Sequence, residues 1–534
     1  MKVSEFLLQT LEKNGVRRIF GNPGTTEIPL VNACEKRGKI EYVIALSEVA
    51  AVPMADGCAR ATRSLGVVNL HVAPGLGNGM GALYTAGIAS TPLLVLVGGQ
   101  DRRLLHTRPV LWGPLEKMAG SVCKAVYALA TRHDAAANVK LALRAALTPP
   151  YGPVALICPP DLLEQDIAAA PATVGAPRLS ALGAADARSC ARFLATAKRP
   201  ALIAAEDVHW SDGSAELETL AKTLGAPVYA APYTAVLPVA ASAACYAGYL
   251  PPSMKQLSER LAAHDALFFV GGRGLRTTLY SEAKLPQKKA WVGSDASVLA
   301  PAGEFELARI ADVRGALQEI TVFMKGARAK RVAATLRPAT ALPAARPRAL
   351  HPSRAVHALL GKFRDALWVD ESGLSTSDVR QWMELDAGCY LINGSGGIGW
   401  GLAAAVGAAI GQKKRQVVAV IGDGSALYAS EALWSAEHHG TAMLLVVLSN
   451  RRYTTLNEAA TRLADGPLEA FNLEPPTLDF SGLARLYGWR YAQAATEKEL
   501  HAFLAASGSR FKTNTLLELK LDPALKPVTA SRHF

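Results

Sequence analysis

Short apolar runs along the chain alternate with longer segments in which apolar residues recur at helical spacing. Runs rich in Val, Ile and Leu predict strands at 42–46, 67–72, 92–99 and 153–158, at 200–206, 227–231, 266–272 and 289–295, and at 366–372, 416–425, 443–450 and 515–521. Continuous apolar strands separated by helical segments are typical of parallel sheets that helices cover on both faces. We therefore expect an α/β fold with three open parallel-sheet domains.

Two stretches rich in Ala and Pro interrupt this pattern, at residues 166–185 and 326–352. They show little apolar periodicity, as is usual for linkers. The chain is thus predicted to have an N-terminal domain at 1–165, a central domain at 186–325 and a C-terminal domain at 353–534.

The composition is that of a folded protein. Half of the 534 residues are hydrophobic, and the formal net charge is +12, so the chain can bury large cores and is not disordered. Lys and Arg are dispersed, and their densest stretch, 325–348, falls in the second linker. A solvated linker explains this charge better than a nucleic-acid site does.

Several features bear on where the protein resides. The first fifteen residues predict an amphipathic helix, because Lys2, Glu5, Glu12 and Lys13 stand where a signal peptide would be apolar. Residues 387–412 are uncharged but rich in glycine, which favours a buried turn and helix over a membrane span. The seven cysteines have no CxxC spacing, so neither a disulfide framework nor a zinc ribbon is indicated. We expect a cytoplasmic protein with no membrane and no nucleic-acid partner.

Two polar motifs in the last third follow predicted strands. Gly422-Asp423-Gly424-Ser425 ends the first, and Asn450 ends the next. Carboxyl ends of parallel strands meet at one edge, where the Asp423 carboxylate, the Asn450 amide oxygen and the Arg452 carbonyl would suit Mg²⁺. The glycines would let a diphosphate approach the backbone, with Ser425 donating to it. Without the spaced Asn, GDGS would indicate only a structural turn.

These residues resemble the thiamine diphosphate (ThDP) enzyme superfamily, whose cofactor motif is GDG followed by an Asn-Asn pair; here that pair is Ser449-Asn450. Three blocks in the first third, FGNPGTTE (20–27), ALSEVAA (45–51) and NLHVAPGLGN (69–78), are similar to its benzoylformate decarboxylase branch. The resemblance runs along nearly the whole chain. It implies pyrimidine-binding, central and diphosphate-binding domains in that order.

Glu48 follows the strand at 42–46 and is flanked by apolar residues. We expect its carboxyl to be shielded from water, which favours the protonated form. The resemblance implies that Glu48 hydrogen-bonds N1′ of the cofactor's aminopyrimidine and so promotes removal of the proton at thiazolium C2. A surface acid that caps the following helix is the alternative.

The resemblance also implies two residues that face the substrate. His71 would move protons near neutral pH, for which histidine is suited, and Thr25 would contact the substrate carboxylate. A merely structural histidine at a strand end is the alternative for His71.

Four further residues are implied to contact the cofactor. The Gly396 carbonyl would accept from the 4′-amino group, and Ile398 would force the cofactor into its bent shape. Ser375 and Thr376 are weaker candidates for the diphosphate, because their alignment needs a short gap.

One position departs from the benzoylformate decarboxylases. Their second active-site histidine is replaced here by Thr278, which cannot titrate near pH 7. Either His106 takes that role or the reaction differs. The pocket wall with Thr455 and Leu456 is also rather polar, and Arg276 and Arg452 could select an anionic or polar substrate. We therefore expect a 2-oxo acid other than benzoylformate, and the sequence leaves open which one.

The predicted activity is ThDP- and Mg²⁺-dependent (or Ca²⁺-dependent) non-oxidative decarboxylation of a 2-oxo acid to an aldehyde and CO₂, with carboligation when a second aldehyde is present. An acetolactate-synthase-like transferase and a catalytically inactive ThDP-binding relative are the alternatives. FAD is not expected, because GGRGLR (271–276) lacks the third glycine of GxGxxG. The resemblance implies active sites at the subunit interface of a homodimer or homotetramer.

Overall fold

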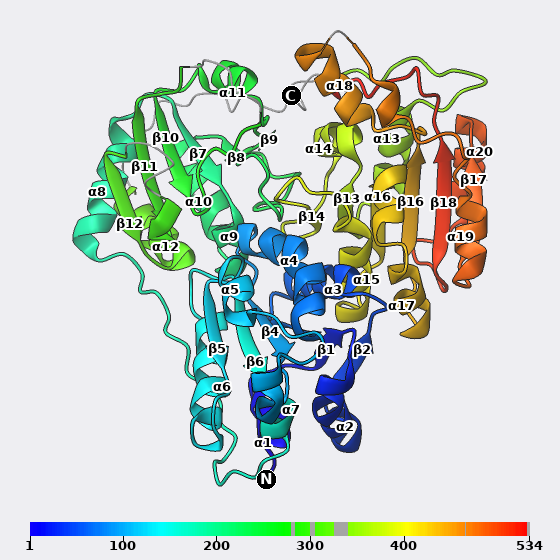
Figure 1. Ribbon diagram of the computed structural model, residues 1–534. Coiled ribbons are helices and arrows are strands. Elements are labelled where there is room, and N and C mark those ends of the chain that lie inside the picture. Colours follow the sequence, from blue (N-terminus) through cyan, green and yellow to red (C-terminus); the bar gives the residue numbers. More distant parts are fainter. Residues whose placement is uncertain (279–283, 299–304, 325–339, 465, 531–534) are drawn as a thin grey trace. The chain divides into compact units, whose positions relative to one another are not determined.

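The computed structural model describes residues 1–278, 284–298, 305–324, 340–464 and 466–530. They form three six-stranded parallel sheets flanked by helices (Figure 1), which confirms the predicted α/β fold class. The chain divides into two compact units: unit 1 holds residues 1–178, 394–414 and 428–441, and unit 2 holds the remainder. Residues 326–339 of the predicted second linker lie outside the described ranges.

Unit 1 contains the first sheet, in the strand order β2-β1-β3-β4-β6-β5. Four of its strands were predicted, whereas β1 and β5, each four residues long, were not. The strands are β1 (Arg18–Gly21), β2 (Glu41–Ile44), β3 (Gly66–Leu70), β4 (Leu93–Gly98), β5 (Ala125–Ala128) and β6 (Pro153–Cys158).

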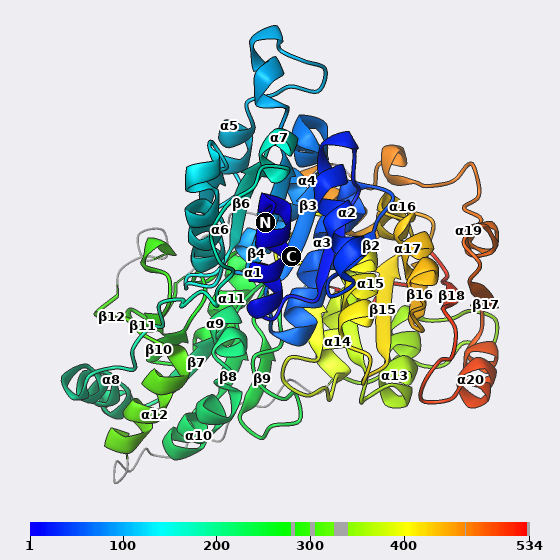
Figure 2. The ribbon, with the colours of Figure 1, turned by 90° about the horizontal axis from the view of Figure 1, so that it is seen from below.

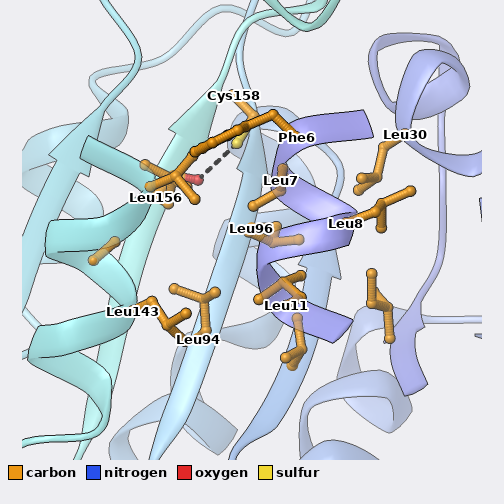
Figure 3. Packing of buried hydrophobic residues seen from close by; sticks show 14 of the residues in the cluster. Phe6, Leu7, Leu8, Leu11, Leu30, Leu94, Leu96, Leu143, Leu156 and Cys158 are labelled. Carbon is orange, nitrogen blue, oxygen red and sulfur yellow. Dashed lines mark hydrogen bonds between the residues drawn. The ribbon is translucent and has the colours of Figure 1, made fainter. Parts of the chain in front are cut away.

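Helices cover both faces of this sheet (Figure 1). One face carries α1 (Val3–Lys13), α2 (Ile28–Arg37), α6 (Arg132–Ala146) and α7 (Pro160–Leu163); the other carries α3 (Glu48–Thr62), α4 (Val72–Ile88) and α5 (Leu115–Gly120). The predicted amphipathic helix at the N-terminus is α1. Figure 3 shows its Phe6, Leu7 and Leu11 beside leucines of β4 and β6, so its apolar face forms part of the core.

The predicted buried turn and helix at 387–412 contains the short strand β14 (Tyr390–Ile392) and helix α15 (Gly401–Gly411). Helix α15 packs against α3, and α17 (Ala432–His438) packs against α15. Buried glycines make the α3–α15 contact close: Gly57 faces the backbone of Ala404, and Gly407 faces the backbone of Met54.

Unit 2 contains the second sheet, in the order β12-β11-β10-β7-β8-β9. Helices α8 (Ala184–Thr196), α10 (Ser214–Leu224) and α12 (Val313–Met324) pack together beside this sheet. The buried leucines of α11 (Met254–Leu261) belong to its hydrophobic core. The short helix α9 (Glu206–Trp210) follows the first strand of the sheet, β7. The strands are β7 (Pro200–Ala204), β8 (Val228–Ala230), β9 (Tyr246–Tyr249), β10 (Ala266–Val270), β11 (Lys288–Gly293) and β12 (Leu307–Ile310). Of these, β9 and β12 were not predicted.

The third sheet, also in unit 2, has the order β14-β13-β15-β16-β18-β17. Besides β14 it contains β13 (Leu367–Glu371), β15 (Val417–Gly422), β16 (Leu444–Ser449), β17 (Arg490–Ala494) and β18 (Thr515–Lys520). Its helices include α13 (Pro352–Lys362), α14 (Thr376–Trp382), α16 (Asp423–Tyr428), α18 (Thr454–Leu463), α19 (Phe480–Leu486) and α20 (Glu497–Ala506).

Each sheet has a point at which the strand order reverses direction. These switch points lie between β1 and β3, between β7 and β10, and between β13 and β15. Open α/β sheets bind ligands beyond the carboxyl ends of the strands at such points. Among the described residues, no helix has both the length and the apolar character needed to cross a membrane.

Candidate active site

Three loops of unit 1 meet at the carboxyl edge of the first sheet. Gly21 at the end of β1 pairs with Ile44 of β2 and with Asn69 of β3. The segments after these strands carry Thr25–Glu27, then Ser47 and Glu48, then His71. The order of the strands, and not proximity in sequence, therefore brings these groups to one edge.

The loops after β1 and β3 are joined by a hydrogen-bonded pair. Oε2 of Glu27 lies 2.7 Å from Nδ1 of His71 and accepts from the N–H of Gly24, also at 2.7 Å. Oε1 accepts from the Thr26 hydroxyl at 2.6 Å. The Glu27 side chain is only 2% exposed, whereas that of His71 is 21% exposed. A buried carboxyl group thus orients a more accessible imidazole.

Sequence analysis did not single out Glu27, although it lies inside the FGNPGTTE block. The pairing depends on β1 lying beside β3, and β1 was not among the predicted strands. One signal could have identified Glu27. It is a carboxylate that follows one strand of a switch point, while a histidine follows the other strand.

Glu48 is the first residue of α3, and Ser47 before it is the N-cap: its hydroxyl oxygen accepts from the N–H of Ala50 at 3.2 Å. The Ser47 hydroxyl also donates to the Glu431 carboxylate. Glu48 is 5% exposed, and its Oε2 accepts from the side-chain amide of Asn78 at 3.2 Å. Because Ser47 performs the capping, the Glu48 carboxyl is left to meet other partners at this edge.

The other candidates in unit 1 are more exposed. Thr25 begins the 3₁₀ turn Thr25–Glu27, and His106 lies on the exposed segment between β4 and α5, which extends away from the sheet (Figure 2). Gly396 has φ +85°, and the Ile398 side chain is 43% exposed. The loop that holds both is tied to α4, since the hydroxyls of Ser395 and Thr85 lie 2.8 Å apart.

In unit 2, the adjacent parallel strands β15 and β16 bring Asp423 and Asn450 together. Oδ2 of Asp423 accepts from the backbone N–H of Asn450 at 3.0 Å and of Arg451 at 2.6 Å, and Oδ1 accepts from Gly424 at 2.9 Å. Burial raises the pKa of Asp423 to about 6, against the lowering effect of these backbone hydrogen bonds. A bound cation would offset the burial of this carboxylate.

The donor set around Asp423 fits Mg²⁺. The Asn450 side-chain oxygen lies in the turn after β16, where it accepts from the N–H of Arg452 at 3.2 Å, and the Asp423 carboxylate lies beside it at the end of β15. Such hard oxygens are the ligands that Mg²⁺ prefers. Within the described ranges, no group of three or more His, Cys, Asp or Glu side chains could hold a metal. A cation here would therefore rely on backbone and amide oxygens, with water and phosphate completing its shell.

The remaining diphosphate candidates surround this turn. Gly422 ends β15, and Gly424 and Ser425 are the second and third residues of α16, where the Tyr453 ring packs over Gly424. Ser375 is buried after β13, the strand next to β15. Thr376 is less available, because its hydroxyl donates to Asp370 at 3.2 Å.

The predicted pocket-wall residues lie in different parts of unit 2. Thr455 and Leu456 are in the first turn of α18; the Thr455 hydroxyl faces Gly373, and Leu456 is exposed. Arg276 follows β10 of the second sheet. It donates to the Tyr233 carbonyl at 2.9 Å and lies 3.4 Å from the Glu206 carboxylate. The hydroxyl oxygen of Thr278 is buried, and its backbone N–H donates to the Pro252 carbonyl at 3.0 Å. Arg276 is thus already paired with an acid.

Comparison with known proteins gives matches over all three sheets. Family models described as the N-terminal TPP binding domain, the central domain and the C-terminal TPP binding domain of thiamine pyrophosphate enzymes match residues 1–120, 187–320 and 371–515. Benzoylformate decarboxylase of Pseudomonas aeruginosa is 32% identical over 93% of this chain and 94% of its own length.

Two solved structures are also similar over nearly their full lengths. Benzoylformate decarboxylase of Polynucleobacter necessarius is 25% identical with a TM-score of 0.92, covering 99% of this chain and 100% of its own. A 4-hydroxybenzoylformate decarboxylase of Rhodococcus jostii, described as thiamine diphosphate-dependent, is 28% identical with a TM-score of 0.86, covering 98% and 99%.

Proposed function

We propose that this chain, which belongs to the thiamine pyrophosphate enzyme family, decarboxylates a 2-oxo acid to an aldehyde and CO₂. ThDP, when bound, supplies a nucleophilic carbon and takes up the electrons that CO₂ leaves behind. The chain's own residues bind and orient the reactants and move protons. The predicted family is thereby confirmed, and the similar decarboxylases support the predicted reaction.

The Glu27–His71 pair is the observation that favours decarboxylation over transfer to a second 2-oxo acid. Release of an aldehyde requires a proton at the carbon that lost CO₂, whereas transfer to a second 2-oxo acid forms a carbon–carbon bond there instead. An accessible imidazole held by a buried carboxylate is suited to deliver that proton. In this proposal His71 donates the proton, Glu27 orients the ring and stabilises its charged form, and Thr25 contacts the substrate carboxylate.

Glu48 would act on the cofactor in unit 1. Its shielded carboxyl would hydrogen-bond N1′ of the aminopyrimidine and exchange a proton with it. The exposed Ile398 and the carbonyl of Gly396 would contact the bent cofactor and its 4′-amino group.

The diphosphate would be held in unit 2. Asp423, the Asn450 amide oxygen and the Arg452 carbonyl would ligate Mg²⁺, or Ca²⁺ in its place. Gly422, Gly424 and Ser425 would face the diphosphate, with Ser375 nearby and Thr376 as a weaker contact. Active sites at the subunit interface of a cytoplasmic homodimer or homotetramer complete the proposal.

An acetolactate-synthase-like transferase is the second candidate, and many such enzymes hold FAD in the central domain. The structure offers an argument against FAD at the switch point between β7 and β10. There Oδ2 of Asp207 accepts from the N–H of Gly272 at 2.8 Å, and Oδ1 accepts from the N–H of Ser294 at 3.0 Å. An internal carboxylate thus takes the N–H groups that a dinucleotide phosphate would need.

The substrate side chain is a separate question. Thr278 in place of a second histidine supports a substrate other than benzoylformate, and His106 is the other candidate for that proton role. Arg276 supports an anionic substrate less well than the sequence suggested, because Glu206 already pairs with it.

The test is a panel of 2-oxo acids, including pyruvate, benzoylformate and an acid with an anionic side chain, with CO₂ and product mass measured together. Aldehyde in an amount equal to CO₂ supports decarboxylation. Acetolactate or another branched ketol as the main product, or a yellow flavin-containing protein, would favour the transferase, and turnover of no substrate would favour the inactive relative.

A further inference from the structure

The Glu48 carboxyl has a neighbour that the proposed function has not used. The side-chain amide of Asn78, six residues into α4, donates to Oε2 of Glu48 at 3.2 Å. Among the residues that the structure describes, no other side chain forms a hydrogen bond with the Glu48 carboxyl. Asn78 itself is exposed in the single chain, so its amide lies over a carboxyl that is almost fully buried.

The start of α4 places Asn78 there. Val72 adopts φ +43°, a conformation that costs a β-branched residue free energy and that the surrounding fold must hold in place. Gly75 and Asn78 are three residues apart and therefore lie on the same face of the helix. A Cβ on Gly75 would lie 2.7 Å from Oε1 of Glu48, so the absence of a side chain at Gly75 makes room for one carboxyl oxygen while Asn78 contacts the other.

The neighbouring titratable groups have other partners. The hydroxyl of Tyr42, on the strand before α3, donates to Asn69 at 2.9 Å. Glu27 interacts with Thr26, Gly24 and His71. The amide of Asn78 is therefore the group suited to fix the orientation of the Glu48 carboxyl.

We propose that Asn78 is a positioning residue for Glu48, an inference that rests on the proposed function. Because its Nδ2 only donates, it favours an acceptor at Oε2, so the proton of the acid form is carried on Oε1. It also stabilises the carboxylate that forms when this proton leaves, since hydrogen bonds to charged groups are the stronger ones. Asn78 thus determines which oxygen exchanges a proton with the cofactor and keeps both protonation states accessible.

The test measures the exchange rate of the C2 proton of bound ThDP in the holoenzyme, across about pH 5 to pH 8. Asn78→Leu should slow exchange about 10- to 100-fold at every pH. Asn78→Asp should approach wild-type exchange at low pH, where the new acid can donate, and lose it as that acid ionises beside Glu48. Asn138→Asp, which changes an amide in α6 on the opposite face of the sheet, should have no effect.

A second readout is binding of ThDP and of an analogue that lacks the N1′ acceptor. Wild type should prefer ThDP, and Asn78→Leu should reduce that preference without weakening binding of the analogue. Exchange within about twofold of wild type in both Asn78 variants, or pH-independent loss in Asn78→Asp, would overturn the positioning role. Wild-type exchange in Glu48→Gln would instead overturn the proposed function, and with it this inference.

Discussion

Nδ1 of His71 lies 2.7 Å from Oε2 of Glu27, although the two residues are 44 positions apart in the sequence. Neither residue belongs to a strand. Each follows a strand at the switch point of the first sheet, and the parallel pairing of β1 with β3 brings them together. A Cβ on Gly24 would collide with the imidazole, so the backbone there approaches the ring as closely as glycine allows.

Glu27→Gln should lower the decarboxylation rate about 10- to 100-fold, because a neutral amide stabilises the charged imidazole less than a carboxylate does. ThDP binding should not change, since Glu27 contacts no proposed cofactor ligand. The measurement is kcat on the best 2-oxo acid together with the cofactor Kd. Glu5→Gln on α1 is the matched control, and a Glu27 variant as active as that control would contradict the pair's role.

Asp423→Asn should abolish Mg²⁺-supported binding of ThDP, with Kd rising at least about 100-fold, because an amide cannot neutralise the cation. Equilibrium dialysis with and without Mg²⁺ measures this. The folded state should persist, since the amide keeps the size of the side chain. Asp479→Asn, at an exposed helix N-cap, controls for the loss of one carboxylate, and holo-enzyme formation by Asp423→Asn would refute the metal site.

Gly407→Ala should destabilise unit 1 by about 1 to 3 kcal/mol, because the added methyl group would meet the backbone of Met54 where α15 packs against α3. Gly81→Ala is the control. Gly81 lies in α4 with open space around it, and there alanine should be neutral or stabilise by up to about 1 kcal/mol. In thermal unfolding, Gly407→Ala should lower Tm, whereas Gly81→Ala should leave Tm unchanged or raise it. Equal losses of Tm in the two variants would contradict the close packing.

His264 should make stability depend on pH. Its Nε2 lies 3.2 Å from the Tyr229 hydroxyl and its Nδ1 lies 3.2 Å from the Arg199 carbonyl, an arrangement that suits the neutral ring. Burial lowers the pKa of His264, so below the ordinary histidine pKa of about 6.5 the unfolded chain takes up the proton more readily. The stabilisation is thus present above that pH and is lost as pH falls through the lowered pKa.

The check is Tm of wild type and His264→Gln at about pH 7.5 and about pH 5.5. Glutamine cannot take up a proton, so the advantage of wild type over the variant should shrink at the lower pH. An advantage that stays constant or grows would show that burial of the neutral ring is not the cause.

Much of the fold could be predicted because its strands are long and apolar. Strands such as β4, β6 and β16 are buried along their whole length, and their sequences are continuous apolar runs that predict a buried strand. The strands that were not predicted are short or only partly buried. For example, β1 has four residues and begins with Arg18, and β17 is buried only at its last residue, Ala494. Their conformation is set by the neighbouring strands with which they pair, which local sequence does not reveal.

The residues of the candidate site also fall into two groups: those that the local sequence identifies and those that it does not. Asp423 and Asn450 could be predicted because both follow apolar strands that are consecutive in the sheet. The contacts of Glu27 with His71 and of Asn78 with Glu48 could not be predicted, because they depend on which strands are neighbours and on how α4 begins. Local sequence identifies residues at strand ends, whereas the order of the strands decides which of them meet.

The most direct test of the central claim is the initial rate of CO₂ release from a 2-oxo acid by the purified protein, with ThDP and Mg²⁺ added together, separately or not at all. We predict release, with an equal amount of aldehyde, only when both are present. CO₂ release that needs no ThDP, or a complete absence of release from every 2-oxo acid with both cofactors bound, would contradict the account.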